Sequence, residues 1–403
     1  MSHARLNRRQ FLHRSSLIAM APTVPAFLGR TVRATEPNND GRILVVIQLS
    51  GGNDGINTVV PFADEGYAKH RDKLRLSTDR LIKVNDQVGL HPALRPAAKL
   101  LENGQLAIVQ GVGYPNPNRS HGVSMAIWQT ARLDPAEHKT FGWIGRAMDR
   151  HSALADGSAH SILLGDEDPP IALRGRRSTS VSLAHLEELK LKASTGLFRA
   201  SVDDSSDDLL VFARRASLDA RSTAALIDEV TKNSASDTSL YPKTELAGRL
   251  KSIAQLIKAD FSTPVYYAIQ SGYDTHAAQL PTHARLLREL AGAMKAFLDD
   301  LQAAGLSKRV LTLCFSEFGR RVKENASLGT DHGTAAPVLI AGSSVNSGPL
   351  GQPPSMTDLA NGDLKMQTDF RQVYATILQD WLGVDSASAL GGSFDRLRLI
   401  AST

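Results

Sequence analysis

The sequence is poor in cysteine. Its 403 residues include one, Cys314, so no disulfide can form within the chain and no cysteine can carry a lipid near the N-terminus. Cys314 lies inside an apolar run, where a cysteine is far more often a core residue than a nucleophile. The glycine-rich stretch at 50–55 lacks the GxxxxGK[ST] and GxGxxG spacings, which argues against a nucleotide-phosphate loop there.

The body of the chain has little excess charge of either sign. The formal net charge is +5, but residues 1–34 hold six Arg and no Lys, Asp or Glu. Of 46 Lys and Arg, 40 therefore remain beyond residue 34, against 41 acidic residues. A nearly neutral body gives no reason to expect nucleic acid or an acidic membrane as a partner.

The first 34 residues have the features of an export signal. Residues 7–12, NRRQFL, form a twin-arginine pattern, and a short apolar stretch at 16–28 is followed by a cleavage pattern at 32–34. We expect the twin-arginine translocase to export the chain, folded, to the periplasm or beyond. The apolar stretch is too short to span a bilayer, so we expect no stable membrane anchor. The alternative is a basic amphipathic helix of a cytosolic protein.

Apolar runs alternating with helical patterns predict an α/β fold for residues 35–403. Four runs have the length of strands buried on both faces, at 42–49, 106–112, 264–270 and 310–315, and a further run follows at 336–341. Helical spacing predicts helices at 91–102, 122–131, 286–301 and 370–382.

The region 151–260 has a different character. Short strand-like pieces at 161–164 and 171–173 give way to a polar stretch and then to helical patterns at 207–231 and 243–258. We interpret this region as an insertion that caps part of the sheet. Since such a cap would set the substrate, the sequence does not identify the substrate.

Polar side chains follow each of the four strands. They are Asp54 after the first, Arg119, Ser120 and His121 after the second, Asp274 and His276 after the third, and Glu317 and Arg320 after the fourth, with Asp331 and His332 just beyond. The loops that follow parallel strands lie at one edge of a sheet, where α/β proteins bind ligands. Each group also has a structural explanation: solvated carboxylates, a satisfied histidine, or, for Ser120, a helix N-cap.

Together these groups suit a metal site. Carboxylates neutralise divalent cations and imidazoles add affinity for first-row metals, so we expect one or two ions, zinc first, with manganese, magnesium or calcium as alternatives. Paired cations clamp the attacking and leaving oxygens of a displacement at phosphorus or sulfur. At a helix N-terminus, Ser120 would be stabilised as an alkoxide nucleophile.

Six sequence blocks resemble a known family. LSGGNDG, HPAL, NRSH, GYDTH, SEFGR and GTDHG, which span 49–333, are similar to the signature blocks of the bacterial family called domain of unknown function 1501. That family is commonly exported by the twin-arginine route and belongs to the alkaline phosphatase/sulfatase-like superfamily. The resemblance implies a three-layer α/β/α sandwich with a mostly parallel central sheet.

The resemblance also implies residue roles. Asp54 would be a first-strand metal ligand, Ser120 the nucleophile, and Asp274 and His276 the ligands of one metal. Glu317 would end the strand that carries Thr-Ser-Asp-His-Gly in phosphatases and sulfatases, with Asp331 and His332 as a later element. In a second alignment, Asp331 and His332 are themselves the Asp-His element and Glu317 stands behind the ligands.

The chain departs from the superfamily pattern at several points. The Asp-to-His spacing is shorter than in phosphatases, Glu317 replaces an aspartate, and no histidine follows His332. No cysteine stands at position 120 and the C-x-P-x-R pattern is absent, which argues against an ordinary type I sulfatase.

The leading hypothesis is an exported metal-dependent hydrolase of phosphate or sulfate-like esters. Ser120 is its nucleophile, and Arg119, Arg320 and His121 are candidates for holding a small anionic substrate. Two alternatives stay open: a non-catalytic exported binding protein with the same fold, and a metal-dependent phosphoryl mutase or transferase.

Overall fold

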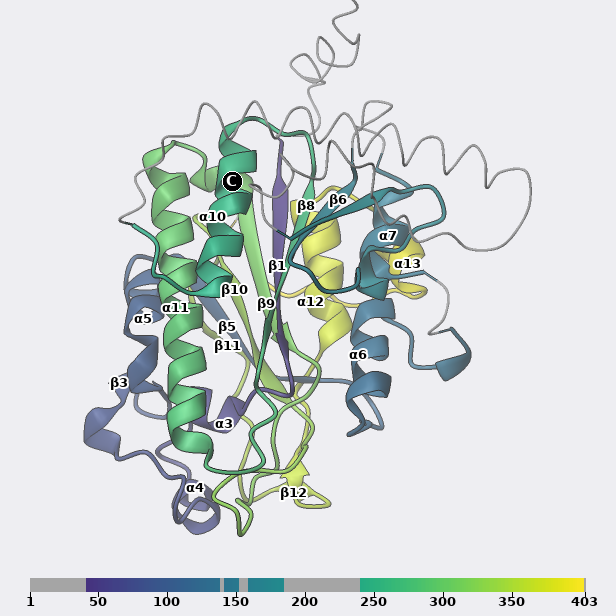
Figure 1. Ribbon diagram of the computed structural model, residues 1–403. Helices are drawn as coiled ribbons and strands as arrows, with labels where there is room; N and C mark the ends of the chain where they lie inside the picture. The colour runs from purple at the N-terminus through teal and green to yellow at the C-terminus, as the bar shows by residue number, and fades with distance from the viewer. Residues whose placement is uncertain (1–40, 138–140, 152–158, 185–239, 402–403) are drawn as a thin grey trace, which may run out of the picture.

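A computed structural model describes residues 41–137, 141–151, 159–184 and 240–401 (Figure 1). The predicted export signal at 1–34 and the predicted helix at 207–231 lie outside the described residues.

In the described part of the chain, a central sheet of nine strands forms the middle layer (Figure 1). The strands run in the order β11-β5-β10-β9-β1-β8-β6-β7, and β14 pairs with β5. Their bounds are β1 (Ile43–Ser50), β5 (Leu106–Gly113), β6 (Ser161–Leu164), β7 (Ser180–Leu183), β8 (Val265–Ser271), β9 (Val310–Ser316), β10 (Ala336–Ala341), β11 (Gly348–Leu350) and β14 (Thr368–Asp369). The pairings of β10 with β5 and β9 are antiparallel and the other pairings of this sheet are parallel. The predicted α/β class with a mostly parallel sheet is confirmed.

Strand β1 occupies the centre because it is apolar on both faces. Ile43, Val45 and Ile47 pack into one buried cluster, while Leu44 and Val46 pack into the other. This alternation follows from the two-residue period of a strand. Burying a side chain of this size stabilises the fold by about 1.5–3 kcal/mol, so it is favourable for helices to cover both faces of β1.

The two helical layers lie on opposite faces of the sheet (Figure 1). The first contains α5 (Arg95–Glu102), α10 (Glu245–Lys258) and α11 (Gln279–Ala303). The second contains α6 (His121–Thr130), α7 (Trp143–Met148), α12 (Phe370–Thr376), the π-helix η6 (Ile377–Trp381) and α13 (Ser386–Leu390). This is the predicted three-layer sandwich. None of the helices within the described ranges is long and apolar enough to cross a membrane.

Smaller elements surround one end of the sheet. They are α3 (Gly55–Thr58), α4 (Glu65–His70), a three-stranded sheet of β2 (Val59–Val60), β4 (Gly89–Leu90) and β3 (Ile82–Lys83), and the hairpin of β12 (Leu359–Ala360) and β13 (Asp363–Leu364). Short 3-10 turns lie at Thr78–Arg80, Pro92–Leu94, Pro135–Glu137, Ile171–Leu173 and Ser307–Arg309. The predicted strand-like piece at 171–173 is thus wrong, because three apolar residues suit a buried helical turn as well as a strand.

The region predicted as a cap, 151–260, contributes to the main sandwich where it is described. β6 and β7 extend the central sheet beyond β8, and α10 packs on the sheet beside α11. Those parts are not a cap. For residues 185–239, which lie outside the described ranges, the cap stays a prediction.

The strand directions bring four loops to one edge of the sheet. Parallel pairing aligns Ser50 at the end of β1 with Ser271 of β8, and Leu49 with Ser316 of β9. Because β10 runs the other way, it begins at this same edge, where its first residue, Ala336, pairs with Val112 near the end of β5. The edge is the lower end in Figure 1, where α3 follows β1.

Candidate metal centre

The turn after β1 lets two strand exits approach each other closely. Gly51 has φ +119°, and a Cβ there would lie 2.4 Å from the amide nitrogen of Asp274. Gly52 has φ +75°, and its Cβ would lie 2.2 Å from the ring of Phe318. Glycine alone fits both the backbone conformation and the space. The SGGNDG turn therefore packs the exits of β8 and β9 against that of β1.

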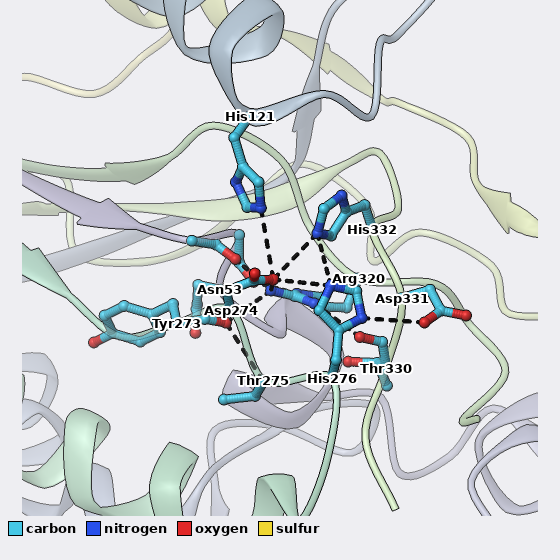
Figure 2. A network of polar contacts seen from close by, with 12 residues as sticks. Asn53, His121, Tyr273, Asp274, Thr275, His276, Arg320, Thr330, Asp331 and His332 are labelled. Atoms are coloured by element: carbon cyan, nitrogen blue, oxygen red, sulfur yellow. Dashed lines mark hydrogen bonds and ion pairs between the residues drawn. The ribbon is translucent and has the colours of Figure 1, made fainter. Parts of the chain in front are cut away.

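Asp274 stands at the centre of three histidines (Figure 2). Its Oδ1 lies 3.0 Å from Nε2 of His276, 3.1 Å from Nε2 of His332 and 3.6 Å from Nε2 of His121. The Nε2 atoms of His276 and His332 are 2.9 Å apart. The Asp274 side chain is 48 % exposed, so solvent reaches the group.

The other ring nitrogen of each histidine faces an acceptor. Nδ1 of His121 lies 2.8 Å from Oε1 of Glu317, that of His276 lies 3.2 Å from Oδ1 of Asp331, and that of His332 lies 2.8 Å from the carbonyl oxygen of Arg119. Carboxylates and carbonyls accept hydrogen bonds, so Nδ1 of each ring can carry the proton in the tautomer that a metal ligand needs. Each Nε2 is then left with a lone pair directed at Asp274. Such outer acceptors are typical of metal-binding histidines.

The donor set fits a divalent cation. Two Nε2 lone pairs at 2.9 Å repel each other unless a positive charge lies between them. Zinc ligands at 2.0–2.1 Å in a tetrahedron stand about 3.3 Å from one another, close to the distances among Asp274, His276 and His332. His121, Asp274 and His332 form an overlapping group whose ligand atoms lie within 4.8 Å of one another. Nitrogen with carboxylate oxygen suits zinc, manganese or iron.

The charge of Asp274 completes this site. Burial raises the pKa of its carboxyl, but the hydrogen bond and the charge of the Arg320 guanidinium oppose burial, and the pKa is lowered to about 2. Asp274 is therefore ionised at neutral pH.

Glu317 and Asp331 stand behind the histidines. Glu317 is buried, and its Oε1 also accepts the amide of Gly51 at 2.9 Å, while its Oε2 accepts the hydroxyl of Ser316 at 3.0 Å. Glu317 and Asp331, both expected as ligands, instead contact Nδ1 of a candidate ligand histidine, whereas His121, expected to hold the substrate, lies beside Asp274 among the candidate ligands. The place of Glu317 agrees with the second of the two alignments, whereas the place of Asp331 agrees with neither.

Arg320 holds the loops rather than a substrate. The side chain is buried and donates to the carbonyls of Gly52 at 2.6 Å, Thr330 at 2.8 Å and Tyr273 at 2.9 Å, to that of Gly51, and to Oδ1 of Asp274 at 2.7 Å. With its three nitrogens engaged, Arg320 is a positioning residue, which corrects its expected anion-binding role.

Arg119 forms an ion pair but stays partly exposed to solvent. Its guanidinium pairs with the buried carboxylate of Asp363, on the hairpin of β12 and β13, and its side chain remains 40 % exposed.

Asp54 lies in a separate ion pair. Its Oδ2 lies 2.6 Å from Nη1 of Arg71, its Oδ1 lies 3.1 Å from Nη2, and the side-chain amide of Gln279 donates to Oδ2. Burial raises the pKa of Asp54, yet the charge and hydrogen bonds of Arg71, with His283 and Gln279, lower it to about 2. Among the described residues its side-chain partners include none of the candidate ligands, which corrects its expected role as a ligand.

Ser120 precedes the first residue of α6. It is exposed, its amide donates to Oδ1 of Asn118 at 2.8 Å, and its hydroxyl makes no capping hydrogen bond. Both neighbours touch the centre, Arg119 through its carbonyl and His121 through its ring. The expected position at a helix N-terminus is therefore found, without the capping bond of a purely structural serine.

A model of the family described as "protein of unknown function (DUF1501)" matches residues 42–400. The chain belongs to the DUF1501 family. A comparison with curated proteins finds no match.

Solved structures similar to this DUF1501 chain include the PsFucS1 sulfatase from Pseudoalteromonas sp., with TM-score 0.41 and 12 % identity over 91 % of this chain and 72 % of that one. The zinc complex of the C-terminal periplasmic domain of EcEptC from Escherichia coli has TM-score 0.37 and 9 % identity, over 76 % of this chain and 75 % of that one. The phosphonate monoester hydrolase SpPMH from Silicibacter pomeroyi has TM-score 0.33 and 12 % identity over 89 % and 76 %. Similarity at this level transfers no residue roles to DUF1501.

Sequence reasoning missed three residues that organise this DUF1501 site: Arg71, Gln279 and Asp363. Arg71 stands in an ordinary charged stretch, HRDK, and Asp363 in a short turn, so neither has a local signal. Gln279 has a weak one, as a polar residue five positions after Asp274 that opens a long helix and is fully buried.

Proposed function

We propose that this DUF1501 protein is a metal-dependent hydrolase of phosphate or sulfate-like esters with Ser120 as its nucleophile. The observation that carries the proposal is the convergence of three imidazole Nε2 atoms on the ionised Asp274, each with its Nδ1 held by an acceptor. Three imidazoles and one carboxylate, fixed in this way and half open to solvent, suit a cation that also contacts a substrate.

The proposed centre holds one cation. Asp54, which was also expected as a ligand, is neutralised by Arg71 and needs no metal. A divalent cation bound at Asp274, His276 and His332, with His121 beside it, supplies Lewis-acid polarisation of an ester oxygen and favours an ionised hydroxyl nearby. The chain's own contribution is to fix the ligand atoms before the substrate arrives.

Ser120 is proposed as the nucleophile because of its place. It stands between two residues that touch the centre, and the first-turn amides of the ten-residue helix α6 follow it. Those amides and the positive end of the helix dipole stabilise an anionic ester group, the task first expected of Arg320. The partly exposed guanidinium of Arg119 adds positive charge on the same side.

Export belongs to the proposal on sequence grounds alone. The twin-arginine pattern at 7–12 supports delivery of a folded protein to the periplasm or beyond. Processing of the full-length chain in cells that lack the translocase, compared with parent cells, tests this part. Unchanged processing and location would contradict it.

The metal is tested first. Wild-type protein reloaded with zinc or manganese should hold about one equivalent by elemental analysis, as expected for a single site. His276→Ala and His332→Ala should each bind it at least about tenfold more weakly. His70→Ala, on α4, is the matched control and should bind as wild type does. A wild-type protein that binds no metal after reloading leaves the non-catalytic binding protein as the better hypothesis.

The nucleophile is tested on the loaded protein. With aryl phosphates, phosphodiesters and aryl sulfates as probes, Ser120→Ala should lower kcat/KM at least about a thousandfold while metal content stays unchanged. Ser388→Ala removes a serine near the start of another helix, α13, and should keep full activity. Full activity in Ser120→Ala would rule out the assignment. Transfer of phosphate to an added alcohol without net hydrolysis would favour the mutase or transferase.

A further inference from the structure

We infer that Gln279 is a positioning residue whose side chain holds both ligand-bearing loops of the candidate metal centre in register. The loops are 273–276, after β8, and 329–332, between β9 and β10. The inference rests on the proposed metal centre for its functional meaning, but the geometry it describes exists without a metal.

The side-chain amide of Gln279 joins three segments. Its Oε1 accepts the hydroxyl of Thr275 at 3.0 Å and the hydroxyl of Thr330 at 2.5 Å, while its Nε2 donates to Oδ2 of Asp54. Thr275 stands between Asp274 and His276, and Thr330 directly precedes Asp331. One buried amide therefore reaches the middle of one ligand loop, the approach to the other, and the exit of β1.

The anchor of this amide is rigid. Asp54 is fully buried in its ion pair with Arg71. Arg71 donates further to the carbonyls of Val322 at 2.7 Å and Arg321 at 2.9 Å, in the segment that leads to the 329–332 loop. A buried ion pair with its remaining hydrogen bonds satisfied resists displacement, since moving either partner leaves an unpaired charge.

An amide is the side chain that meets both demands. The two threonine hydroxyls need an acceptor and the ionised Asp54 needs a donor, and a glutamine supplies both at its 0 % exposed position. A methionine of similar size would supply neither. Three buried polar groups would then each lose one hydrogen-bond partner, and the two loops would be held together by fewer contacts.

Gln279 and Arg320 act on different atoms of the same loops. Arg320 holds main-chain carbonyls and Asp274 itself, whereas Gln279 holds threonine hydroxyls and touches no candidate ligand. The loops also share one main-chain bond, from the amide of Thr330 to the carbonyl of Thr275 at 3.2 Å. Protection of that amide from hydrogen exchange reports whether the loops stay together.

The test compares Gln279→Met with Gln129→Met. Gln129, on α6, is also buried, and its side chain bonds Gln48 and the amide of Ile171, so its loss controls for removal of a buried amide elsewhere. Two measurements are made: hydrogen exchange of peptides covering 273–278 and 328–333 in metal-free protein, and zinc affinity by competition with a chromophoric chelator. The absorption spectrum of the cobalt-loaded protein reports ligand geometry.

Gln279→Met should raise exchange in both peptides, weaken zinc binding about tenfold and alter the cobalt spectrum. Gln129→Met should change none of these. If Gln279→Met does not fold, Thr330→Val removes one of the two ties, and Thr263→Val, a buried threonine bonded to Ala159, is its control.

Unchanged exchange in both peptides would overturn the inference whatever the metal result. Raised exchange with an unchanged zinc affinity would overturn the positioning role and leave a purely structural glutamine. Raised exchange in a protein whose wild type binds no metal would support the loop geometry while contradicting the proposed function, so the two failures are distinguishable.

Discussion

At the scale of single residues, the candidate ligands were easier to predict than the residues that hydrogen-bond to them. Asp274, His276 and His332 were expected as ligands from their place after strands, and the structure brings them together. Glu317 was expected as a ligand and instead contacts Nδ1 of His121, and His121 was expected to hold the substrate and instead lies beside Asp274. Both residue types bind metals, and which of them faces outward depends on the Gly51 amide and Ser316 hydroxyl that engage Glu317. Those contacts join strands that are distant in sequence, so no local pattern shows them.

Asp54 gives a prediction about acid stability. Its pKa in the folded protein is about 2, below the ordinary 3.8, so its ionised form stabilises the fold above pH about 4. That stabilisation, about 2 kcal/mol, is lost as the pH falls toward 2. Asp54→Asn leaves the charge of Arg71 buried and unpaired, and should lower the free energy of unfolding by about 3–5 kcal/mol at pH 7.

Urea denaturation of metal-free protein between pH 2 and 7 measures this effect. Asp54→Asn should show a flatter dependence of the free energy of unfolding between pH 4 and 2 than wild type. Asp86→Asn, at an exposed position, should follow the wild type. Parallel curves for Asp54→Asn and wild type would contradict the role given to this ion pair.

At the scale of elements, strand positions were predictable and one strand direction was not. The four main strands lie within one residue of their expected ends, because each is an apolar run bounded by polar or glycine residues. The run at 336–341 carries no mark of its antiparallel direction, since a strand buried on both faces looks alike in either direction. That direction makes 317–335 a loop between neighbouring strands, with both ends fixed in the sheet.

The turn after β1 gives the prediction at this scale. Gly51→Ala must place a methyl group 2.4 Å from the amide nitrogen of Asp274. We expect it to lower the free energy of unfolding by about 2–4 kcal/mol, from overpacking and an unfavourable φ, and to reduce metal content by displacing Asp274.

Gly104→Ala separates strain from crowding. Gly104 also has a positive φ, +74°, but a Cβ there would meet nothing within 4 Å. Gly104→Ala should lower the free energy of unfolding by about 1 kcal/mol and leave the metal content unchanged. Equal costs for the two variants would show that the close approach of the strand exits is unimportant.

At the scale of the whole molecule, the fold class followed from the alternation of runs, whereas the role of 151–260 did not. β6 and β7 are four residues each, too short to be distinguished in sequence from strands of an insertion, yet they complete one side of the sheet. What decides their place is the pairing of β6 with β8 across a long intervening segment, and of β7 with β6, and sequence patterns do not encode such pairing.

A bound cation would connect loops that follow β5, β8 and β9, so it should stabilise the protein globally. At a free zinc concentration 100 times its Kd, the free energy of unfolding should rise by about 2.7 kcal/mol. Thermal unfolding with and without a chelator measures the shift. His332→Ala should show little of it and His70→Ala all of it; a full shift in His332→Ala would place the stabilising ion elsewhere.

The central place of β1 has a consequence for biosynthesis. β1 leaves the ribosome early, but its two neighbours, β8 and β9, end at Ser271 and Ser316. Until β8 is synthesised, both hydrogen-bonding edges of the apolar strand β1 are unpaired, and one stays unpaired until β9 is synthesised. Unpaired edges favour chaperone binding and aggregation. Completion of the sheet must therefore await synthesis of most of the chain.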